Sequence, residues 1–417
     1  MLKVVVSLFS LLLGVATLLV GMGALGTLLG VRAGLEHFGA PVTGAVMGAY
    51  FLGFIVGSYV CPPLLQRVGH IRAFAVMAAI TTAVALMHGL VVHPVSWFAL
   101  RVVNGTCMMG LYMSVESWLN AITPNERRGQ VFAVYMATTF IAMGCGQYLL
   151  LAGDVTTLEP FVLAAIFLAL GLVPIALTRI GQPTPVEVPR LSLKHLFAMA
   201  PLGVVGALCA GLTTGAFWGM GPLFGQRIGL SPAGIAAFMS AAIFGGALLQ
   251  WPIGRLSDNN DRRLVLAVVC LGAVVAALFT YGLIQALPEA LYVAAFIYGG
   301  FAFTIYSLCV AHTNDHMAKE QMLEATRSLL LLHGVGAVIG PALAGVLMEQ
   351  LGPGSLPFYF AAVLTLLGIY ALYRSRLHIP VIPAERFQPM AGSTSQVVLE
   401  MDPRTEEPAA EVQKDAA

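Results

Sequence analysis

Charged residues are scarce in this sequence: Asp, Glu, Lys and Arg make up only 10% of its 417 residues. Soluble globular domains carry about 25%, so most of this chain is not built to face water. The net charge is +1, and no basic stripe occurs outside short loops. This balance excludes nucleic-acid binding as the main function.

Cysteine is also rare, and its placement excludes several kinds of site. The six cysteines stand singly inside or at the edges of apolar runs, and no CxxC pair occurs. A zinc ribbon and a dithiol redox site are therefore excluded, and we expect neither a metal nor a cofactor. The sequence also lacks HExxH, GxGD and GxSxG motifs, so we do not expect an enzyme.

Long apolar runs fill most of the chain. Hydrophobic residues make up 58% of it, and the mean hydropathy is +0.86. A bilayer-spanning helix needs about 20 mainly apolar residues, and the runs are continuous rather than alternating, which excludes a β-barrel. We predict an all-α integral membrane protein with twelve transmembrane helices near residues 4–30, 42–66, 73–92, 95–119, 129–152, 159–178, 196–225, 231–254, 264–284, 289–313, 325–350 and 355–374.

The distribution of Lys and Arg predicts the orientation. With the N-terminus in the cytoplasm, all but three of the 21 Lys and Arg residues fall on the cytoplasmic side. The exceptions are Arg32 and Arg227 outside and Arg101 within a helix. Such an excess is typical of cytoplasmic loops. We therefore predict a multi-pass protein of the bacterial inner membrane with both termini in the cytoplasm.

The longest polar interruption divides the runs six and six. It spans residues 180–195 and is rich in proline, so we interpret it as a cytoplasmic linker between one six-helix bundle at 1–179 and another at 196–374. Residues 375–417 lack apolar runs and contain many Pro, Glu, Asp and Gln residues. This composition predicts a disordered cytoplasmic tail.

The two halves repeat weakly at an offset of 190 to 194 residues. Tyr112 then meets Tyr306, and Asn120 meets Asn314. Such matches are expected if six helices were duplicated. Parallel six-helix halves related by an axis along the membrane normal are a transporter architecture.

Four short stretches carry motifs. GRLSDNNDRR, residues 254–263, supplies Gly254, Asp258, Arg262 and Arg263. Its first-half copy PLLQRVGHIR keeps Arg67 and Arg72 but has Gln66 at the position that corresponds to Asp258. Arg101 precedes Gly105 as R-x-x-x-G. GAVIGPALAG supplies the glycine–proline element Gly336, Gly340, Pro341 and Gly345.

These motifs resemble those of the major facilitator superfamily of secondary transporters. The stretches VESWLN, NERRG and AHTND resemble its YcaD-like subgroup of bacterial inner-membrane transporters. The resemblance implies two pseudo-symmetric six-helix bundles that rock around a central site, lined by helices 1, 4, 7 and 10. It also implies that the glycine–proline element packs helices closely. That element normally marks helix 5 of drug antiporters, whereas here it falls in helix 11.

The charge-rich motif predicts a cytoplasmic gate. A carboxylate can accept hydrogen bonds from the free N–H groups at a helix N-terminus, and pseudo-symmetry makes that terminus the start of helix 5. We predict that Asp258 holds this end and nearby arginines when the cytoplasmic side is closed, and releases them on opening. The alternative is a solvated charge cluster that only sets topology. The predicted gate residues are Arg67, Arg72, Arg128, Gly254, Asp258, Arg262, Arg263 and Asp315.

Two ionisable residues stand inside apolar runs, where such groups are costly and often functional. Glu116 is a candidate proton carrier, or else the partner of an arginine such as Arg67, Arg72 or Arg128. Arg101 is a candidate contact for an anion or a proton relay, or else a packing arginine. The predicted cavity and coupling residues are Arg101, Asn104, Tyr112, Glu116, Phe217, Trp218, Tyr298 and Tyr306.

These observations together predict alternating-access transport of a small organic solute by a monomer in the lipid bilayer. Glu116 favours proton coupling, and the glycine–proline element with the aromatic residues favours export. The alternatives are an uncoupled facilitator of the same fold and a membrane sensor that does not transport.

Overall fold

The computed structural model describes residues 2–124, 127–177, 192–283 and 289–377, and six residues of the C-terminal tail. The first half of the chain forms α1 Leu2–Leu35, α2 Ala40–Val68, α3 His70–Leu90, α4 Pro94–Ile122, α5 Arg128–Gly146, η2 Gln147–Leu151, α6 Glu159–Leu170 and α7 Leu172–Ala176. The second half forms α8 Leu193–Met199, α9 Pro201–Arg227, α10 Pro232–Asp258, α11 Arg262–Leu283, α12 Ala290–Ala302, α13 Ile305–Asp315, α14 Lys319–Leu351 and α15 Ser355–Arg376.

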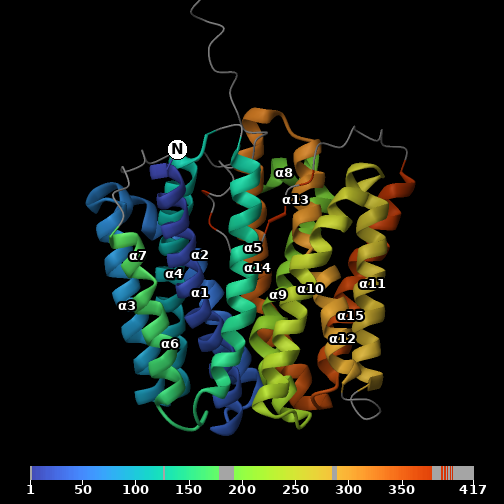
Figure 1. Ribbon diagram of the computed structural model, residues 1–417. Coiled ribbons are helices and arrows are strands. Elements are labelled where there is room, and N and C mark those ends of the chain that lie inside the picture. The colour runs from blue at the N-terminus through green and yellow to red at the C-terminus, as the bar shows by residue number, and fades with distance from the viewer. Residues whose placement is uncertain are drawn as a thin grey trace, which may run out of the picture.

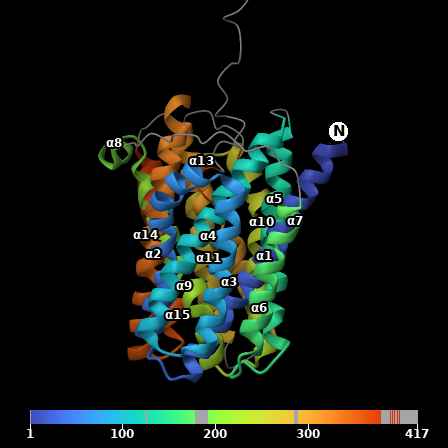
Figure 2. The same ribbon diagram turned by 90° about the vertical axis from the view of Figure 1, so that its left-hand side faces the viewer.

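The long helices run side by side across the molecule (Figures 1 and 2). In the described part of the chain, eleven helical stretches are long and apolar enough to cross a membrane. The prediction of an all-helical membrane protein is confirmed. Three spans are each built from two consecutive pieces: α5 with η2, α6 with α7, and α12 with α13. The predicted helix near 196–225 begins within the short α8 and continues as α9.

The predicted span that is not among these eleven, near residues 95–119, corresponds to α4. With 29 residues, this helix is about 43 Å long at 1.5 Å per residue, more than a hydrocarbon core of about 30 Å. It is less apolar than the others because it carries Arg101, Asn104 and Glu116, all buried within the protein. Polar residues that face inward rather than toward lipid are typical of the helix that lines a pathway.

Contacts between helices repeat in the two halves. In the first half α1 packs on α5, α2 on α4, and α3 on α6; in the second half α9 packs on α14, α10 on α12, and α11 on α15. The two groups meet through α2 against α14, α5 against α10 and α1 against α9. The α2–α14 and α5–α10 contacts are equivalent, because the repeat relates α2 to α10 and α5 to α14. The predicted pair of pseudo-symmetric bundles is therefore confirmed.

The glycine–proline element lies where three long helices meet. Gly336 and Gly340 in α14 face the α9 backbone at Leu208 and Leu212. Gly345 faces the Ala40 carbonyl of α2. A methyl group at Gly340 would overlap the Leu212 carbonyl oxygen, so only glycine permits this approach of α14 to α9.

The molecule has two polar ends, which we name by their residues. The terminal face carries the start of α1, the end of α10 and the described tail residues, and it is the upper end in Figure 1. The distal face carries the end of α1, the start of α2 and the end of α14.

The C-terminal tail differs from its prediction. The sequence predicts disorder from residue 375, but α15 continues to Arg376. The structure also places Met390 and Ser395 in the interior, with 2% and 0% of their surface exposed. Composition favours disorder only where no partner surface compensates the cost of ordering the chain, and here the two helix groups supply that surface.

Candidate functional site

A cavity of about 70 Å³ lies where the two helix groups meet. Residues of α1, α2, α4, α5 and α9 line it, including Thr27, Tyr50, Arg101, Tyr112 and Trp218. The lining is mostly apolar and aromatic with a few polar groups, which is the usual character of a small-molecule site. Both halves of the chain contribute, so relative movement of the groups would change the cavity.

Arg101 is the charged group of this cavity. Only 4% of its surface is exposed. Its guanidinium carbon lies 4.6 Å from the centre of the Tyr50 ring, and its Nη1 donates to Asn104 Oδ1 over 3.4 Å. Within the described residues, Arg101 Nε and Asn104 Nδ2 have no hydrogen-bond partner. A buried charge without full compensation is costly, so these donors are available to an acceptor group of a ligand.

A second polar pair borders the same cavity. The Thr27 hydroxyl of α1 donates to Gln147 Oε1 of η2, while Gln147 Nε2 donates to the Met143 carbonyl oxygen over 3.0 Å. Neither Thr27 nor Gln147 is among the residues predicted from sequence. The only available signal was a polar side chain within an apolar run, and many such side chains merely bond within their own helix.

The predicted aromatic residues do not all meet at this cavity. Tyr112 and Trp218 line it. Phe217 and Tyr298 line a separate apolar cavity of about 20 Å³ in the second group. Tyr306 packs against His333, with ring centres 4.8 Å apart. The structure therefore brings together Arg101, Tyr112 and Trp218 and leaves the other three aromatic residues elsewhere.

Glu116 lies nearer the terminal face and is fully buried. Its Oε1 accepts a hydrogen bond from the Tyr135 hydroxyl of α5 over 2.9 Å. Its Oε2 accepts one from the backbone N–H of Ser395 in the tail, over 3.0 Å. A proton carrier at this position would exchange with the space at the terminal face. The alternative of an ion pair with Arg67, Arg72 or Arg128 stays a prediction.

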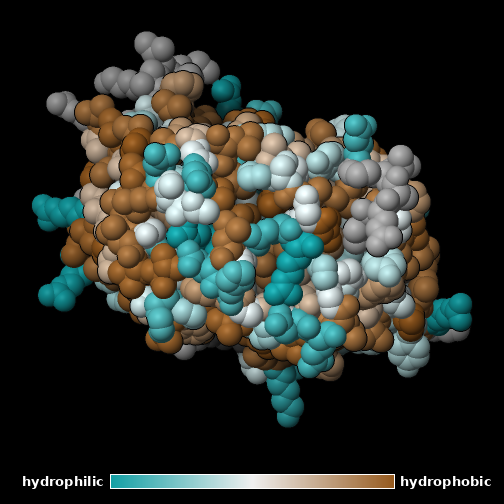
Figure 3. Space-filling model, turned by 90° about the horizontal axis from the view of Figure 1, so that it is seen from below, coloured by the Kyte–Doolittle hydropathy of each residue, from teal (hydrophilic) through white to brown (hydrophobic). Residues whose placement is uncertain are grey.

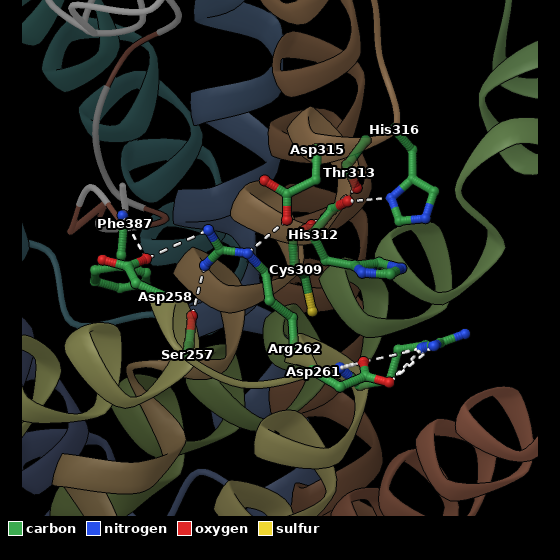
Figure 4. A network of polar contacts seen from close by, with 11 residues as sticks. Ser257, Asp258, Asp261, Arg262, Cys309, His312, Thr313, Asp315, His316 and Phe387 are labelled. Atoms are coloured by element: carbon green, nitrogen blue, oxygen red, sulfur yellow. Dashed lines mark hydrogen bonds and ion pairs between the residues drawn. The ribbon is translucent and has the colours of Figure 1, made fainter. Parts of the chain in front are cut away.

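The charged motif forms a network centred on Arg262, which Figure 4 shows. Arg262 Nε donates to Asp315 Oδ2 over 2.6 Å, and Nη1 donates to Ser257 Oγ over 2.5 Å. Nη2 donates to Asp258 Oδ1 over 3.4 Å. Arg262 is only 3% exposed at its side chain. The network therefore joins α10, α11 and α13 within the second group.

Asp258 has one partner of a predicted kind, an arginine, and one that was not predicted. Among the described residues, its Oδ1 accepts hydrogen bonds from Arg262 and from the backbone N–H of Phe387, the latter over 2.8 Å, rather than from the start of α5. Arg262, four residues further along the chain, reaches the carboxylate across the short connection between α10 and α11.

The remaining gate candidates lie at the same face. Arg263 Nη2 pairs with Asp261 Oδ2 over 2.8 Å, and Nη1 donates to the Arg374 carbonyl oxygen over 3.3 Å. Burial opposes ionisation of Asp261, but the hydrogen bonds from Arg263 outweigh it and lower the Asp261 pKa. Arg67 and Arg72 are exposed and Arg128 is half-buried.

Glu349, which sequence analysis missed, joins the two helix groups at the distal face. Arg227 at the end of α9 lies 3.1 Å from Glu349 near the end of α14. Glu349 Oε2 also accepts a hydrogen bond from the Ala40 N–H at the start of α2, over 3.1 Å. Hydrophilic side chains gather across the middle of this face, with hydrophobic ones around them (Figure 3). Glu349 thus ties the second group to the first.

Replacing Glu349 with Gln is expected to loosen the distal face. Glutamine can accept the Ala40 N–H only as a neutral group. This weakens the bond between the groups by about 1 kcal/mol, so the shift toward a distal opening should be about fivefold. Distances between spin labels at Val42→Cys and Leu351→Cys would measure it, as a larger long-distance population. Glu36→Gln is the matched control, since Glu36 follows α1 directly and pairs with Arg32, four residues earlier in the same helix group. Equal distance distributions in the two variants would contradict the prediction.

Comparisons with known proteins agree with this arrangement. A sequence profile described as the Major Facilitator Superfamily matches residues 5–322 and 203–397. The chain belongs to the major facilitator superfamily. It is 29% identical to "Uncharacterized MFS-type transporter YcaD" of Escherichia fergusonii over 376 residues, 88% of this chain and 95% of that one. The corresponding protein of Escherichia coli O9:H4 is 29% identical over 374 residues, 89% and 96% of the two chains.

Solved transporters share the superfamily fold. The nucleoside transporter NupG superposes with a TM-score of 0.71 at 16% identity, covering 89% of this chain and 99% of that one. A bacterial homologue of the lysosomal transporter Spinster, described as inward-facing and unoccupied, gives 0.67 at 13% identity, covering 98% and 99%. A D-xylose–proton symporter gives 0.64 at 12%, covering 93% and 99%. The chain is a secondary transporter of this superfamily and not an enzyme.

Proposed function

We propose that this transporter carries a small organic solute with an anionic or other acceptor group through the cavity at Arg101. The observation that carries the proposal is a pair of buried donors, Arg101 Nε at the cavity and the neighbouring Asn104 Nδ2, which lack hydrogen-bond partners among the described residues. Tyr50 and Trp218 add aromatic surface next to them. A solute with a carboxylate beside an apolar body would satisfy both kinds of lining.

The solute would pass by alternating access between the terminal and distal faces. The two six-helix halves, residues 1–179 and 196–374, would rock as bodies, with residues 180–195 as the linker, which lies largely outside the described residues. The hydrogen bond from the Ala40 N–H to Glu349 joins the two halves at the distal face. The terminal face would be cytoplasmic, in the inner membrane of a bacterium, and one chain would suffice. Reporter fusions at both ends of the chain test this orientation.

Flux into proteoliposomes tests the proposed function. The panel contains small carboxylates, their amides and uncharged analogues, each with and without an imposed proton gradient. We expect carboxylates to move faster than their amides. Flux that is the same with and without the proton gradient would favour an uncoupled facilitator. Absence of flux for every solute in the panel would favour a sensor. Export, as in an antiporter, predicts that solute leaves the terminal side when protons enter from the distal side.

Proton coupling is assigned to Glu116, whose buried carboxylate lies between Tyr135 and the tail. Replacing Glu116 with Gln keeps the size of the side chain but removes its proton exchange. We expect gradient-driven accumulation to fall to the level seen without a gradient, while solute exchange at equal concentrations continues. Ser395→Ala is the control, because it perturbs the tail contact and keeps the carboxylate. Undiminished accumulation in Glu116→Gln would place coupling elsewhere.

A further inference from the structure

Six described residues of the C-terminal tail lie between the two helix groups at the terminal face: Phe387, Pro389, Met390, Gly392, Ser395 and Val397. We call them the tail segment. Their burial is deep at two points, since Met390 is 2% exposed and Ser395 is fully buried. Specific hydrogen bonds and close contacts to these residues distinguish a binding site from incidental packing.

The second helix group recognises the backbone of Met390. Its N–H donates to Ser307 Oγ over 3.0 Å, and its carbonyl oxygen accepts from the same hydroxyl over 2.7 Å. Gln250 Nε2 of α10 also donates to that carbonyl oxygen, over 3.3 Å, and to Ser307 Oγ over 2.8 Å. Both polar groups of one peptide residue are thus satisfied by buried side chains, as in sites that bind extended peptides.

The first helix group holds the other end of the tail segment. Ser395 donates from its backbone N–H to Glu116 Oε2 over 3.0 Å, and its hydroxyl donates to the same oxygen. Hydrogen bonds to an ionised acceptor are stronger than those between neutral groups. Because Glu116 belongs to α4 and Ser307 to α13, the tail segment spans the junction of the two halves.

Close approaches at two glycines fit the tail segment to this site. Phe387 lies with its ring against Gly254, where any larger side chain would overlap the ring. Its N–H donates to Asp258, as Figure 4 shows. Gly392 in turn lies against the His333 ring of α14. The charge-rich motif therefore contributes Gly254 and Asp258 to holding the tail.

We propose that the space between the helix groups at the terminal face is a peptide-binding site, and that the tail segment of the same chain occupies it as a plug. Occupied, it blocks the route from the terminal face and wedges the halves apart there. A covalently tethered segment faces its site at an effective concentration on the order of millimolar, so modest contacts suffice to keep it bound. The obstruction of solute by the plug rests on the proposed function. The binding of the tail segment at this place is independent of that function.

A cysteine pair in the full chain tests the binding. Gly254→Cys with Phe387→Cys should form a disulfide under mild oxidation in membranes, detected by mass spectrometry of the linked peptides. Each single variant controls for the native cysteines, and Gly254→Cys with Val397→Cys controls for chance encounters. We expect the first pair to link far faster than the control pair. Equal rates would overturn the proposal.

A charge at Ser395 provides the second test, in the same cysteine-pair background. Ser395→Asp places a second carboxylate beside Glu116 and should slow crosslinking at least about tenfold, because like charges repel strongly where water is excluded. Ser395→Ala keeps the backbone bond to Glu116 and should slow it less. If Ser395→Asp and Ser395→Ala crosslink equally fast, Glu116 does not hold the tail and the proposal is wrong.

Flux with a solute from the panel tests the obstruction separately. Oxidised Gly254→Cys/Phe387→Cys protein should transport slowly, and reduction should restore the flux. Rapid crosslinking together with unchanged flux would overturn the plug and leave the transporter itself intact. Absence of flux even in unmodified protein would instead contradict the proposed function, while the crosslinking results would still decide where the tail binds.

Discussion

Replacing Arg101 with Met is expected to reduce carboxylate flux by about 30-fold or more. Removing one partner of a buried, hydrogen-bonded charge pair costs about 2–5 kcal/mol, and 1.4 kcal/mol corresponds to a factor of ten. The methionine keeps much of the side-chain volume next to Tyr50 but supplies no donor to the solute. Flux of a carboxylate and of its amide, measured side by side in proteoliposomes, gives the result.

Two further variants make this prediction specific. Arg101→Lys keeps the charge but loses the planar donor arrangement, so its flux should lie between those of Arg101→Met and the unchanged protein. Arg255→Met is the matched control, because Arg255 stacks on Trp251 at 3.9 Å on an exposed stretch of α10. If Arg101→Met transports carboxylate as fast as Arg255→Met, the cavity donors do not bind the solute.

Replacing Arg262 with Met is expected to cost about 3–5 kcal/mol of stability, as for other broken buried ion pairs. Asp315 would lose the guanidinium 2.6 Å from its carboxylate, while being only 5% exposed at its side chain. Ser257 would also lose its partner. The purified protein should therefore unfold at a clearly lower temperature in detergent, monitored by the intrinsic fluorescence of its tryptophans.

A double variant separates a lost ion pair from lost packing. Arg262→Met with Asp315→Leu removes both charges, and apolar replacement of a whole buried pair is often neutral or stabilising. It should recover most of the lost stability. Glu36→Gln, which breaks a partly exposed pair between Arg32 and the residue directly after α1, should change the unfolding temperature little. A double variant no more stable than Arg262→Met would mean that the network acts through shape rather than charge.

The two candidate sites depend on different parts of the same arrangement. The Arg101 cavity lies among α1, α2, α4, α5 and α9. The Arg262 network lies within the second group and meets the tail through Asp258. Loss of Arg101 should abolish solute selection without unfolding the protein. Loss of the Arg262 network should instead destabilise the second helix group. Measuring both flux and unfolding temperature on every variant keeps these outcomes apart.

The sequence by itself determined the all-helical membrane fold, the duplication of six helices and the superfamily. It also identified Arg101 and Glu116 as unusual. These features follow from composition along the chain, because lipid selects apolar residues in every span and makes each exception costly. The sequence also identified the charge-rich stretch at 254–263, because its five ionic groups directly follow an uncharged run.

Only the tertiary structure decided which side chains meet. Phe217 and Trp218 are neighbours in α9, yet only Trp218 lines the central cavity. Helices that are apolar on nearly all sides carry little periodicity to fix their rotation. The pairing of Arg227 with Glu349 joins residues far apart in sequence, and the tail segment is ordered only by surfaces of both halves. Such contacts depend on how whole helices approach each other, which no local pattern specifies.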